Sequence, residues 1–398
     1  MVKLSEKINY VGKIDWQLRK FHGEQLSTNR GSSYNAFLIK SEKNVLIDTV
    51  WTPFVAEFID KLEQNIELNK IDYIIALHAE PDHSAALPDL LELIPDTPVY
   101  CTANAIKSLK GYYHKDWNFV PVKTGDVLNI GENDNLTFIE VPMLHWPDQL
   151  MAYFAPEKTL FSSDIFGQHF SSELLFDENV DMDELLKEAL KYYANIVVPY
   201  SKKAVSKLKE LKELNIPIEI IAPAHGIVWK NNPNLILEKY EKWANNYQEN
   251  QITIIYDTMY GSTRKMAEAI TEGIRNIDNT STIKLFNTAN TDSSDIIMEI
   301  FRSKALLVGS PTYNSGILNS VAAIMEELKG IKLQNKKAAT FSSFGWAPAA
   351  TKVLSKLLEE ANFSLMEPSA TINVNWNPTK EDVKKCIEFG EQFADFIK

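Results

Sequence analysis

The sequence has few cysteines and lacks long apolar runs. Only Cys101 and Cys386 occur among its 398 residues, too few and too far apart for a disulfide framework or a cysteine-ligated iron–sulfur site. No run approaches the ~18 apolar residues that a membrane span requires, and the N-terminus lacks the apolar segment of a secretion signal. We therefore expect a cytoplasmic protein that neither enters a membrane nor is exported.

Positive charge is also scarce. The chain has 41 Lys and Arg residues against 53 Asp and Glu residues, which gives a formal net charge of −12. Such an acidic balance argues against nucleic acid or an anionic membrane as the main partner. The content of hydrophobic residues, 45%, is ordinary for a globular protein, and the length suggests two or three domains.

The pattern of expected strands and helices changes near residue 250. Up to that point, short strand-like runs at hairpin-like spacing predict a layered α/β domain with two sheets over residues 1–250. Over residues 251–398, expected strands and helices alternate regularly, which is typical of a doubly wound parallel sheet. Expected strands of the first part include 71–77, 136–141, 159–163, 196–200 and 217–222.

The stretch 78–83, His-Ala-Glu-Pro-Asp-His, follows the apolar run 71–77. Its polar residues would leave the end of a buried strand together, held by the strand while the adjoining loop leaves an opening for a substrate. A polar loop that only caps the next helix is the alternative, but a cap does not need so many ligand-type side chains. The potential metal ligands are His78, Glu80, Asp82 and His83.

Three further candidate ligands also follow strand-like runs: His145, Asp164 and His225. Taken singly, each has an ordinary interpretation, because a lone histidine is usually a surface or core residue and an aspartate often caps a turn. Taken with the stretch 78–83, they complete a set of four histidines, two aspartates and one glutamate. That set is sufficient for two metal ions if one carboxylate bridges them.

Three loops of the second part carry hydroxyl, glycine and aromatic side chains. They cover residues 257–263, 310–316 and 342–346 and follow the first, third and fourth expected strands. In an open doubly wound sheet, such loops converge at the switch point where ligands bind. The first loop opens a helix, whose free N–H groups suit a phosphate, although a serine- and threonine-rich helix cap would look the same.

The stretch 78–83, with His145, Asp164 and His225, resembles the metal site of the metallo-β-lactamase fold. Most hydrolases of that fold carry H-x-H-x-D-H and bind zinc, whereas this chain has Glu80 in place of the second histidine. The pattern H-x-E-x-D-H is similar to that of the flavodiiron proteins, also called A-type flavoproteins. An added carboxylate favours iron that cycles between the ferrous and ferric states.

The resemblance implies an N-terminal metallo-β-lactamase-like αββα sandwich with two iron ions. It assigns three ligands to each iron and one bridge: His78, Glu80 and His145 for one, Asp82, His83 and His225 for the other, and Asp164 between them.

The resemblance further implies that His22, His169 and Tyr193 face the substrate or support the ligands, with a structural role as the alternative for each.

The second part resembles flavodoxin, which implies a C-terminal flavodoxin-like doubly wound parallel sheet with FMN at the three loops. The first loop would hold the phosphate, and the other two would frame the isoalloxazine. Tyr313 and Trp346 are expected to stack on the ring, although they could merely fill a loop. No G-x-G-x-x-G pattern follows any expected strand, so a built-in NAD site is not indicated. The expected FMN-binding residues are Thr258, Met259, Tyr260, Gly261, Ser262, Thr263, Pro311, Thr312, Tyr313, Asn314, Ser343, Phe344, Gly345 and Trp346.

Together the two resemblances imply an oxidoreductase that reduces dioxygen to water, nitric oxide to nitrous oxide, or both. The sequence has no C-x-x-C pair for a fused rubredoxin, so electrons would come from a separate donor such as rubredoxin or a reduced deazaflavin. In this family the flavin of one subunit lies near the iron site of another, which implies a head-to-tail homodimer or a dimer of such dimers.

Two alternatives stay open. One is a binuclear zinc hydrolase of the metallo-β-lactamase fold with an accessory flavodoxin-like domain; Glu80 and the three loops argue against it. The other is a non-enzymatic electron carrier whose metal site is structural, although a structural site does not need so many ligands around an openable centre.

Overall fold

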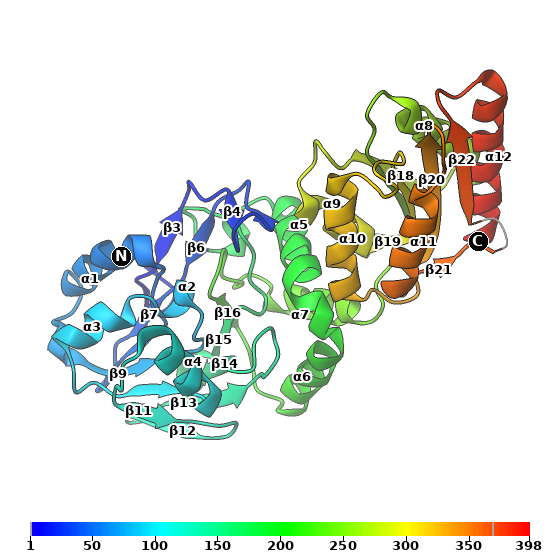
Figure 1. The fold of residues 1–398 in the computed structure, drawn as a ribbon. Helices are drawn as coiled ribbons and strands as arrows, with labels where there is room; N and C mark the ends of the chain where they lie inside the picture. Colours follow the sequence, from blue (N-terminus) through cyan, green and yellow to red (C-terminus); the bar gives the residue numbers. More distant parts are fainter. Residues whose placement is uncertain (1, 368–369) are drawn as a thin grey trace. The chain divides into compact units, whose positions relative to one another are not determined.

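A computed structural model describes residues 2–367 and 370–398 (Figure 1). Contacts divide the chain into two compact units, Met1–Phe21 with Thr28–Ala244, and His22–Ser27 with Asn245–Lys398. Within the described ranges, every helix is too short or too polar to cross a membrane.

The first unit contains two sheets that share one core. Ile47 and Ile75 of the first sheet are buried in one hydrophobic cluster with Phe138 and Phe161 of the second, so the sheets pack face to face. Across the first sheet lie β1 (Val2–Lys3), β2 (Ile8–Tyr10), β7 (Phe37–Ile39), β8 (Asn44–Ile47), β9 (Ile71–Ile75), β10 (Val99–Cys101) and β11 (Phe119–Pro121). Across the second lie β12 (Val127–Gly131), β13 (Asp134–Glu140), β14 (Leu150–Phe154), β15 (Thr159–Ser163) and β16 (Ile220–Pro223). Outside these sheets, β3 (Lys13–Asp15) pairs with β6 (Ser32–Tyr34), and β4 covers Lys20–Phe21.

Helices cover the outer faces of the two sheets. In Figure 1, α1 and α3 lie on one side of the strands and α5, α6 and α7 on the other, which is the expected αββα order. Amphipathic spacing explains the inner faces: α1, for example, buries Phe58 and Leu62, four residues apart. The helices are α1 (Val55–Glu63), α2 (Pro81–Ser84), α3 (Leu87–Leu93), α4 (Ala103–Tyr113), α5 (Met182–Tyr192), α6 (Ser201–Glu213) and α7 (Pro233–Ala244).

The prediction of a strand over residues 196–200 is wrong. These residues belong to a π-helical turn, η5 (Tyr193–Val197), and a 3-10 turn, η6 (Val198–Tyr200), which lead from α5 into α6. The β-branched residues Ile196, Val197 and Val198 gave the segment its strand-like appearance. All three are buried, and tertiary packing of this kind overrides an intrinsic β preference.

The second unit contains one parallel sheet in the order β18-β17-β19-β20, with β21 and β22 both beside β20. This is the doubly wound order expected for a flavodoxin-like domain. Its strands are β17 (Glu249–Tyr256), β18 (Thr282–Asn287), β19 (Ser303–Gly309), β20 (Lys337–Phe344), β21 (Ser364–Leu365) and β22 (Thr371–Asn375). Its helices are α8 (Ser262–Ile277), α9 (Ser293–Arg302), α10 (Asn319–Ile331), α11 (Ala350–Glu360) and α12 (Lys380–Phe396).

A short segment from the N-terminal region completes the second unit. Residues 22–27 include β5 (Leu26–Ser27), which lies against α9. The backbone N of Ser27 donates to the Ser294 Oγ at 3.0 Å, and the two hydroxyl oxygens are 2.9 Å apart. Both side chains are buried, so these hydrogen bonds are shielded from water.

Two glycines allow α8 and α12 to pack closely. A Cβ on Gly273 would lie 1.9 Å from the Ile387 carbonyl oxygen, and a Cβ on Gly390 would lie 2.3 Å from the Ile270 carbonyl oxygen. Because backbone oxygens cannot rotate away, a side chain here would force the helices apart.

We predict that Gly273→Ala and Gly390→Ala each destabilise the second unit by roughly 1–3 kcal/mol through overpacking. Gly330→Ala is the matched control, since Gly330 is exposed on α10 with nothing within 4 Å of its added Cβ; it should be neutral or stabilising by roughly 0.5–1 kcal/mol. Urea unfolding followed by circular dichroism measures the difference. Equal midpoints for Gly273→Ala and Gly330→Ala would contradict the close-packing argument.

Candidate functional site

The expected metal ligands meet at one edge of the first unit. Residues 78–83 follow β9, and the short helix α2 carries Asp82 and His83. His145 follows β13, while Asp164 and His225 come just after β15 and β16. Because β13, β15 and β16 run in the same direction, their carboxyl ends lie at the same edge of the sheet.

The ligand atoms form two groups on either side of Asp164. Each group brings its potential ligand atoms within 4.8 Å of one another; one contains His78, Glu80, His145 and Asp164, and the other contains Asp82, His83 and His225.

The two oxygens of Asp164 face different groups. Oδ2 lies 3.7 Å from the Nε2 of His78 and 3.3 Å from that of His145. Oδ1 lies 3.1 Å from the Nε2 of His83 and 3.3 Å from that of His225. This carboxylate therefore has the position that a bridge between two metal ions requires.

The spacing of the ligand atoms fits first-row metal ions. Atoms bound to one metal at about 2.1 Å lie roughly 3.0–3.5 Å apart in octahedral or tetrahedral geometry. The Nε2 of His78 is 3.2 Å from the Glu80 Oε2, and the Nε2 of His225 is 3.1 Å from the Asp82 Oδ2. In addition, the Asp82 Oδ1 is buried and has no hydrogen-bond partner among the described residues, which is costly unless a cation satisfies it.

Hydrogen bonds at the far side of three imidazoles fix their orientation. The Nδ1 of His78 is 2.8 Å from the Asp148 Oδ2, and the Nδ1 of His83 is 3.1 Å from the Asp48 Oδ2. The Nδ1 of His225 is 2.8 Å from the Ser33 carbonyl oxygen. Each contact leaves Nε2 directed at the centre, as in metal-ligating histidines generally.

Charge also holds the cluster together. Burial disfavours a positive His78, but hydrogen bonds to Asp148 and Glu80 raise its pKa to about 10. Burial acts in the same way on His225, and its contacts with Asp164 and Asp82 raise its pKa to about 9. Although burial would raise the pKa of Asp164, the surrounding histidines hold it well below its usual range. The carboxylates therefore favour positive charge at the centre of the cluster, which a metal cation would supply.

The three residues that were expected to support the metal site have different surroundings within their own units. His169 is buried beside His225, with ring centroids 5.5 Å apart and its Nδ1 2.8 Å from the Ser32 Oγ. His22 is exposed and belongs to the second unit. The Tyr193 hydroxyl is 2.9 Å from the Ser201 Oγ.

Sequence reasoning missed two residues that contact Asp164. The Tyr192 hydroxyl donates to the Asp164 Oδ1 at 3.1 Å, and the Gln149 side-chain amide donates to Oδ2. Burial and the Asp164 charge raise the pKa of Tyr192 well above its usual range, so this phenol keeps its proton. Adjacent tyrosines at the end of α5 point in different directions, and the sequence contains no signal that separates Tyr192 from Tyr193.

Access to the centre differs between the two groups. The Glu80 and His145 side chains are 13% and 9% exposed, whereas those of His83 and His225 are 1% and 2% exposed. Within the first unit, the group around His78 is therefore the more open one.

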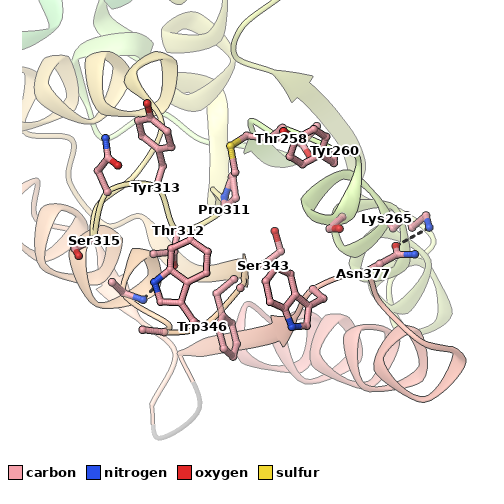
Figure 2. A pocket seen from close by; sticks show the side chains of 18 residues that line it. Thr258, Tyr260, Lys265, Pro311, Thr312, Tyr313, Ser315, Ser343, Trp346 and Asn377 are labelled. Atoms are coloured by element: carbon pink, nitrogen blue, oxygen red, sulfur yellow. Dashed lines mark hydrogen bonds between the residues drawn. The ribbon is translucent and has the colours of Figure 1, made fainter.

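A second site lies at the carboxyl ends of the parallel strands in the second unit. The three expected loops line one cavity of about 800 Å³ (Figure 2), a volume suited to a small-molecule cofactor. All the expected flavin-binding residues line it except Gly261 and Thr263. Thr263 instead joins two of the loops, with its Oγ1 2.9 Å from the Ser343 Oγ.

Gly261 shapes the first loop. It lies at the N-cap of α8 with φ +86°, and its N–H donates to the Thr258 Oγ1 at 3.0 Å. The left-handed conformation favours glycine. The first N–H groups of a helix have no partner inside the helix, so those of α8 would be available to a phosphate.

The cavity also has a wall that the sequence reasoning missed. Trp376 and Asn377 follow β22, and the Lys265 Nζ donates to the Asn377 Oδ1 at 2.8 Å (Figure 2). The Trp376 ring lies 6.4 Å from that of Trp346, and the two side chains are 62% and 91% exposed. Strand β22 is parallel to β20 and ends at the same edge of the sheet, which was the available signal. The further lining residues are Ser315, Ala347 and Ala349.

Comparisons with known proteins cover both parts of the chain. The model of the ODP family beta lactamase matches residues 32–226, and the flavodoxin model matches residues 254–390. The structure of the rubredoxin oxygen:oxidoreductase from Desulfovibrio gigas is similar, with a TM-score of 0.95 and 34% identity over 100% of this chain and 98% of that chain. The flavodiiron protein from Giardia intestinalis gives a TM-score of 0.93 and 29% identity over 99% of this chain and 96% of that one.

Sequence identity to a known protein establishes the family. The anaerobic nitric oxide reductase flavorubredoxin of Escherichia coli strain K12 is 46% identical over 394 residues, which cover 99% of this chain and 82% of that protein. The chain belongs to the flavodiiron protein family. Both the resemblance expected from the metal motif and the fold class of this flavodiiron protein are thereby confirmed.

We predict that Asp148→Asn lowers metal affinity at the group containing His78 by roughly 10–100-fold, because it removes the charge that orients that imidazole. Bound metal per chain, measured during competition with a chelator, should fall toward half of the wild-type value. Asp116→Asn is the control, since Asp116 is 86% exposed in the same unit. If both variants release metal at the same chelator concentration, the orienting role is refuted.

For the cavity of the second unit, we predict that Gly261→Ala weakens FMN binding by up to about tenfold, because a left-handed alanine costs of order 1 kcal/mol and misaligns the loop. Flavin fluorescence titration measures the affinity. Gly125→Ala is matched in strain, with φ +90° and nothing within 4 Å of its added Cβ, but lies in the first unit. An unchanged flavin affinity in Gly261→Ala would refute the role of this loop in FMN binding.

Proposed function

We propose that this flavodiiron protein reduces dioxygen to water, nitric oxide to nitrous oxide, or both, with two iron ions in the first domain and FMN in the second. The proposed domains are residues 1–250 and 251–398. The observation that carries the proposal is Asp164, whose two carboxylate oxygens face two different groups of histidines.

The donor set supports iron rather than a purely zinc-binding site. Glu80, Asp82 and Asp164 supply carboxylate oxygens beside four imidazoles, a mixture that suits iron in both oxidation states. Iron would supply one-electron chemistry toward a bound gas, and FMN would replenish the electrons. His78, Glu80 and His145 would hold one ion, Asp82, His83 and His225 the other, and Asp164 would bridge.

The chain's own residues would bind the metal ions, orient the ligating imidazoles and enclose the centre. Asp148, Asp48 and the Ser33 carbonyl keep the imidazoles directed inward. Tyr192 holds a proton at its hydroxyl and donates it in a hydrogen bond to the bridging Asp164. Burial around His83 and His225 excludes water, which limits side reactions of a partly reduced substrate.

The names of two relatives support nitric oxide and dioxygen as substrates. One is named a nitric oxide reductase and another a rubredoxin oxygen:oxidoreductase. Full reduction of dioxygen takes four electrons, which two ferrous ions and a two-electron-reduced FMN supply together; coupling two nitric oxide molecules takes two. Both names also include rubredoxin, which favours a rubredoxin-type donor over a reduced deazaflavin. A cytoplasmic, head-to-tail homodimer or a dimer of such dimers stays part of the proposal.

The test is the iron, zinc and FMN content of the anaerobically purified chain, followed by gas consumption after full reduction. We expect about two irons and one FMN per chain and consumption of at least one of the two gases. Two zincs without flavin would instead favour the binuclear hydrolase. If the chain holds both irons and FMN but consumes neither gas, only the hypothesis of a non-enzymatic electron carrier would remain.

Glu80→His sharpens the same test, because it replaces the carboxylate with the residue that zinc-binding relatives of the fold carry. The ratio of iron to zinc taken up from a medium containing both should fall. Glu92→His, 70% exposed on α3, is the control for an added surface histidine and should leave the ratio unchanged.

A further inference from the structure

Two aromatic rings connect a proposed iron ligand with the protein surface. The Trp146 ring packs perpendicular to the His78 ring with centroids 5.0 Å apart, and it lies 6.1 Å from the His145 ring. Tyr112, at the end of α4, lies parallel to Trp146 with centroids 6.4 Å apart and an interplanar angle of 11°. These separations are within the range of direct aromatic contact.

The exposure of these residues rises along the path. His78 is fully buried, Trp146 is half-buried, and Tyr112 is 46% exposed. Indole and phenol are the aromatic side chains that lose an electron most readily, so the order from ligand to solvent is imidazole, indole and phenol. The path also begins at the more open group of ligands, which contains Glu80 and His145.

We propose that Trp146 and Tyr112 form a one-electron path from the metal site to the surface, which disposes of oxidising equivalents when FMN supplies too few electrons. This inference rests on the proposed function only for the source of the oxidant. Dioxygen that has received three of its four electrons can take the last one from the protein, and the path determines which residue loses it.

The electrons and protons balance at each step. Trp146 gives one electron to the partly reduced oxygen and becomes an indole radical cation. Tyr112 then gives one electron to Trp146 and its hydroxyl proton to water, which restores the indole and leaves a tyrosyl radical. A soluble thiol returns one electron and one proton to Tyr112, and two oxidised thiols couple into a disulfide.

The buried tyrosines beside the site, Tyr34 and Tyr192, are less suited to this role because a soluble thiol cannot reach them. Tyr34 packs edge-on against the His225 ring at 6.1 Å and also contacts Trp51. However, Tyr34 is 1% exposed and its hydroxyl is 3.5 Å from the buried Asp15 carboxylate. A radical there could not be reached by a thiol, whereas one on Tyr112 could.

The experiment traps the radical and locates it. The full, iron- and FMN-loaded chain is reduced with limiting dithionite and exposed to dioxygen with a nitroso spin trap, and adducts are assigned by peptide mass spectrometry. A parallel sample receives hydrogen peroxide, which takes two electrons and two protons to become water and does not depend on dioxygen reduction. Tyr73, half-buried in the same unit with its ring against Tyr100, is the reference tyrosine.

We expect adducts at Tyr112 several-fold above Tyr73, their loss in Trp146→Phe, and their return in Trp146→Tyr. Freely diffusing radicals would label the exposed Tyr112 equally in all three chains, so persistence in Trp146→Phe at normal iron content overturns the path. Tyr112→Phe is a second variant at an exposed position; it should increase oxygen addition at Trp146, and no increase counts against the proposal.

The two proposals fail in different ways. Normal oxygen consumption with no adduct at Tyr112 refutes the proposed electron path but is consistent with the proposed reductase activity. Absent oxygen consumption, with peroxide-driven adducts at Tyr112 that require Trp146, refutes the reductase and leaves the path. A chain that binds no iron refutes both.

Discussion

The metal site depends on one carboxylate that is shared between two sets of histidines. Asp164 is almost fully buried, and a lone charge at such depth would be costly. Its cost is offset because Oδ1 and Oδ2 each face two imidazoles, and because Tyr192 and Gln149 add hydrogen bonds. The arrangement brings loops after β9, β13, β15 and β16 to a common point, so ligands distant in sequence share one centre.

The clustering of the proposed ligands could be predicted from the sequence because they follow strands. A strand fixes the position of its last residues, and His78, Asp164 and His225 each come within a few residues of one. The convergence of the three loops on one cavity was predictable for the same reason, since parallel strands all end at the same edge. What these sites share is that backbone topology alone, without side-chain detail, brings their residues together.

Side-chain direction could not be predicted in this way. Whether Tyr192 or Tyr193 reaches Asp164 depends on how α5 passes into a π-helical turn, and a difference of one residue rotates the side chain by about 100°. Trp376 was missed because the loop after β22 carries no phosphate-binding pattern. The segment 196–200 was misassigned because Ile196 and two valines suit a buried helix as well as a strand. For the two tyrosines and for the segment 196–200, tertiary packing, which is not local in sequence, decides the outcome.

The segment 22–27 limits how freely the two halves of this protein can be exchanged. Its Ser27 forms hydrogen bonds with Ser294, so a residue synthesised early forms its contact only after a residue much later in the chain has been synthesised. Recombination near residue 250 would transfer a flavodoxin-like domain without this segment and would remove the contacts that Ser27 makes with the buried Ser294 hydroxyl. A donor domain from a relative is therefore compatible only if its own helix presents a small hydroxyl side chain at the same place, and the two halves are constrained to change together.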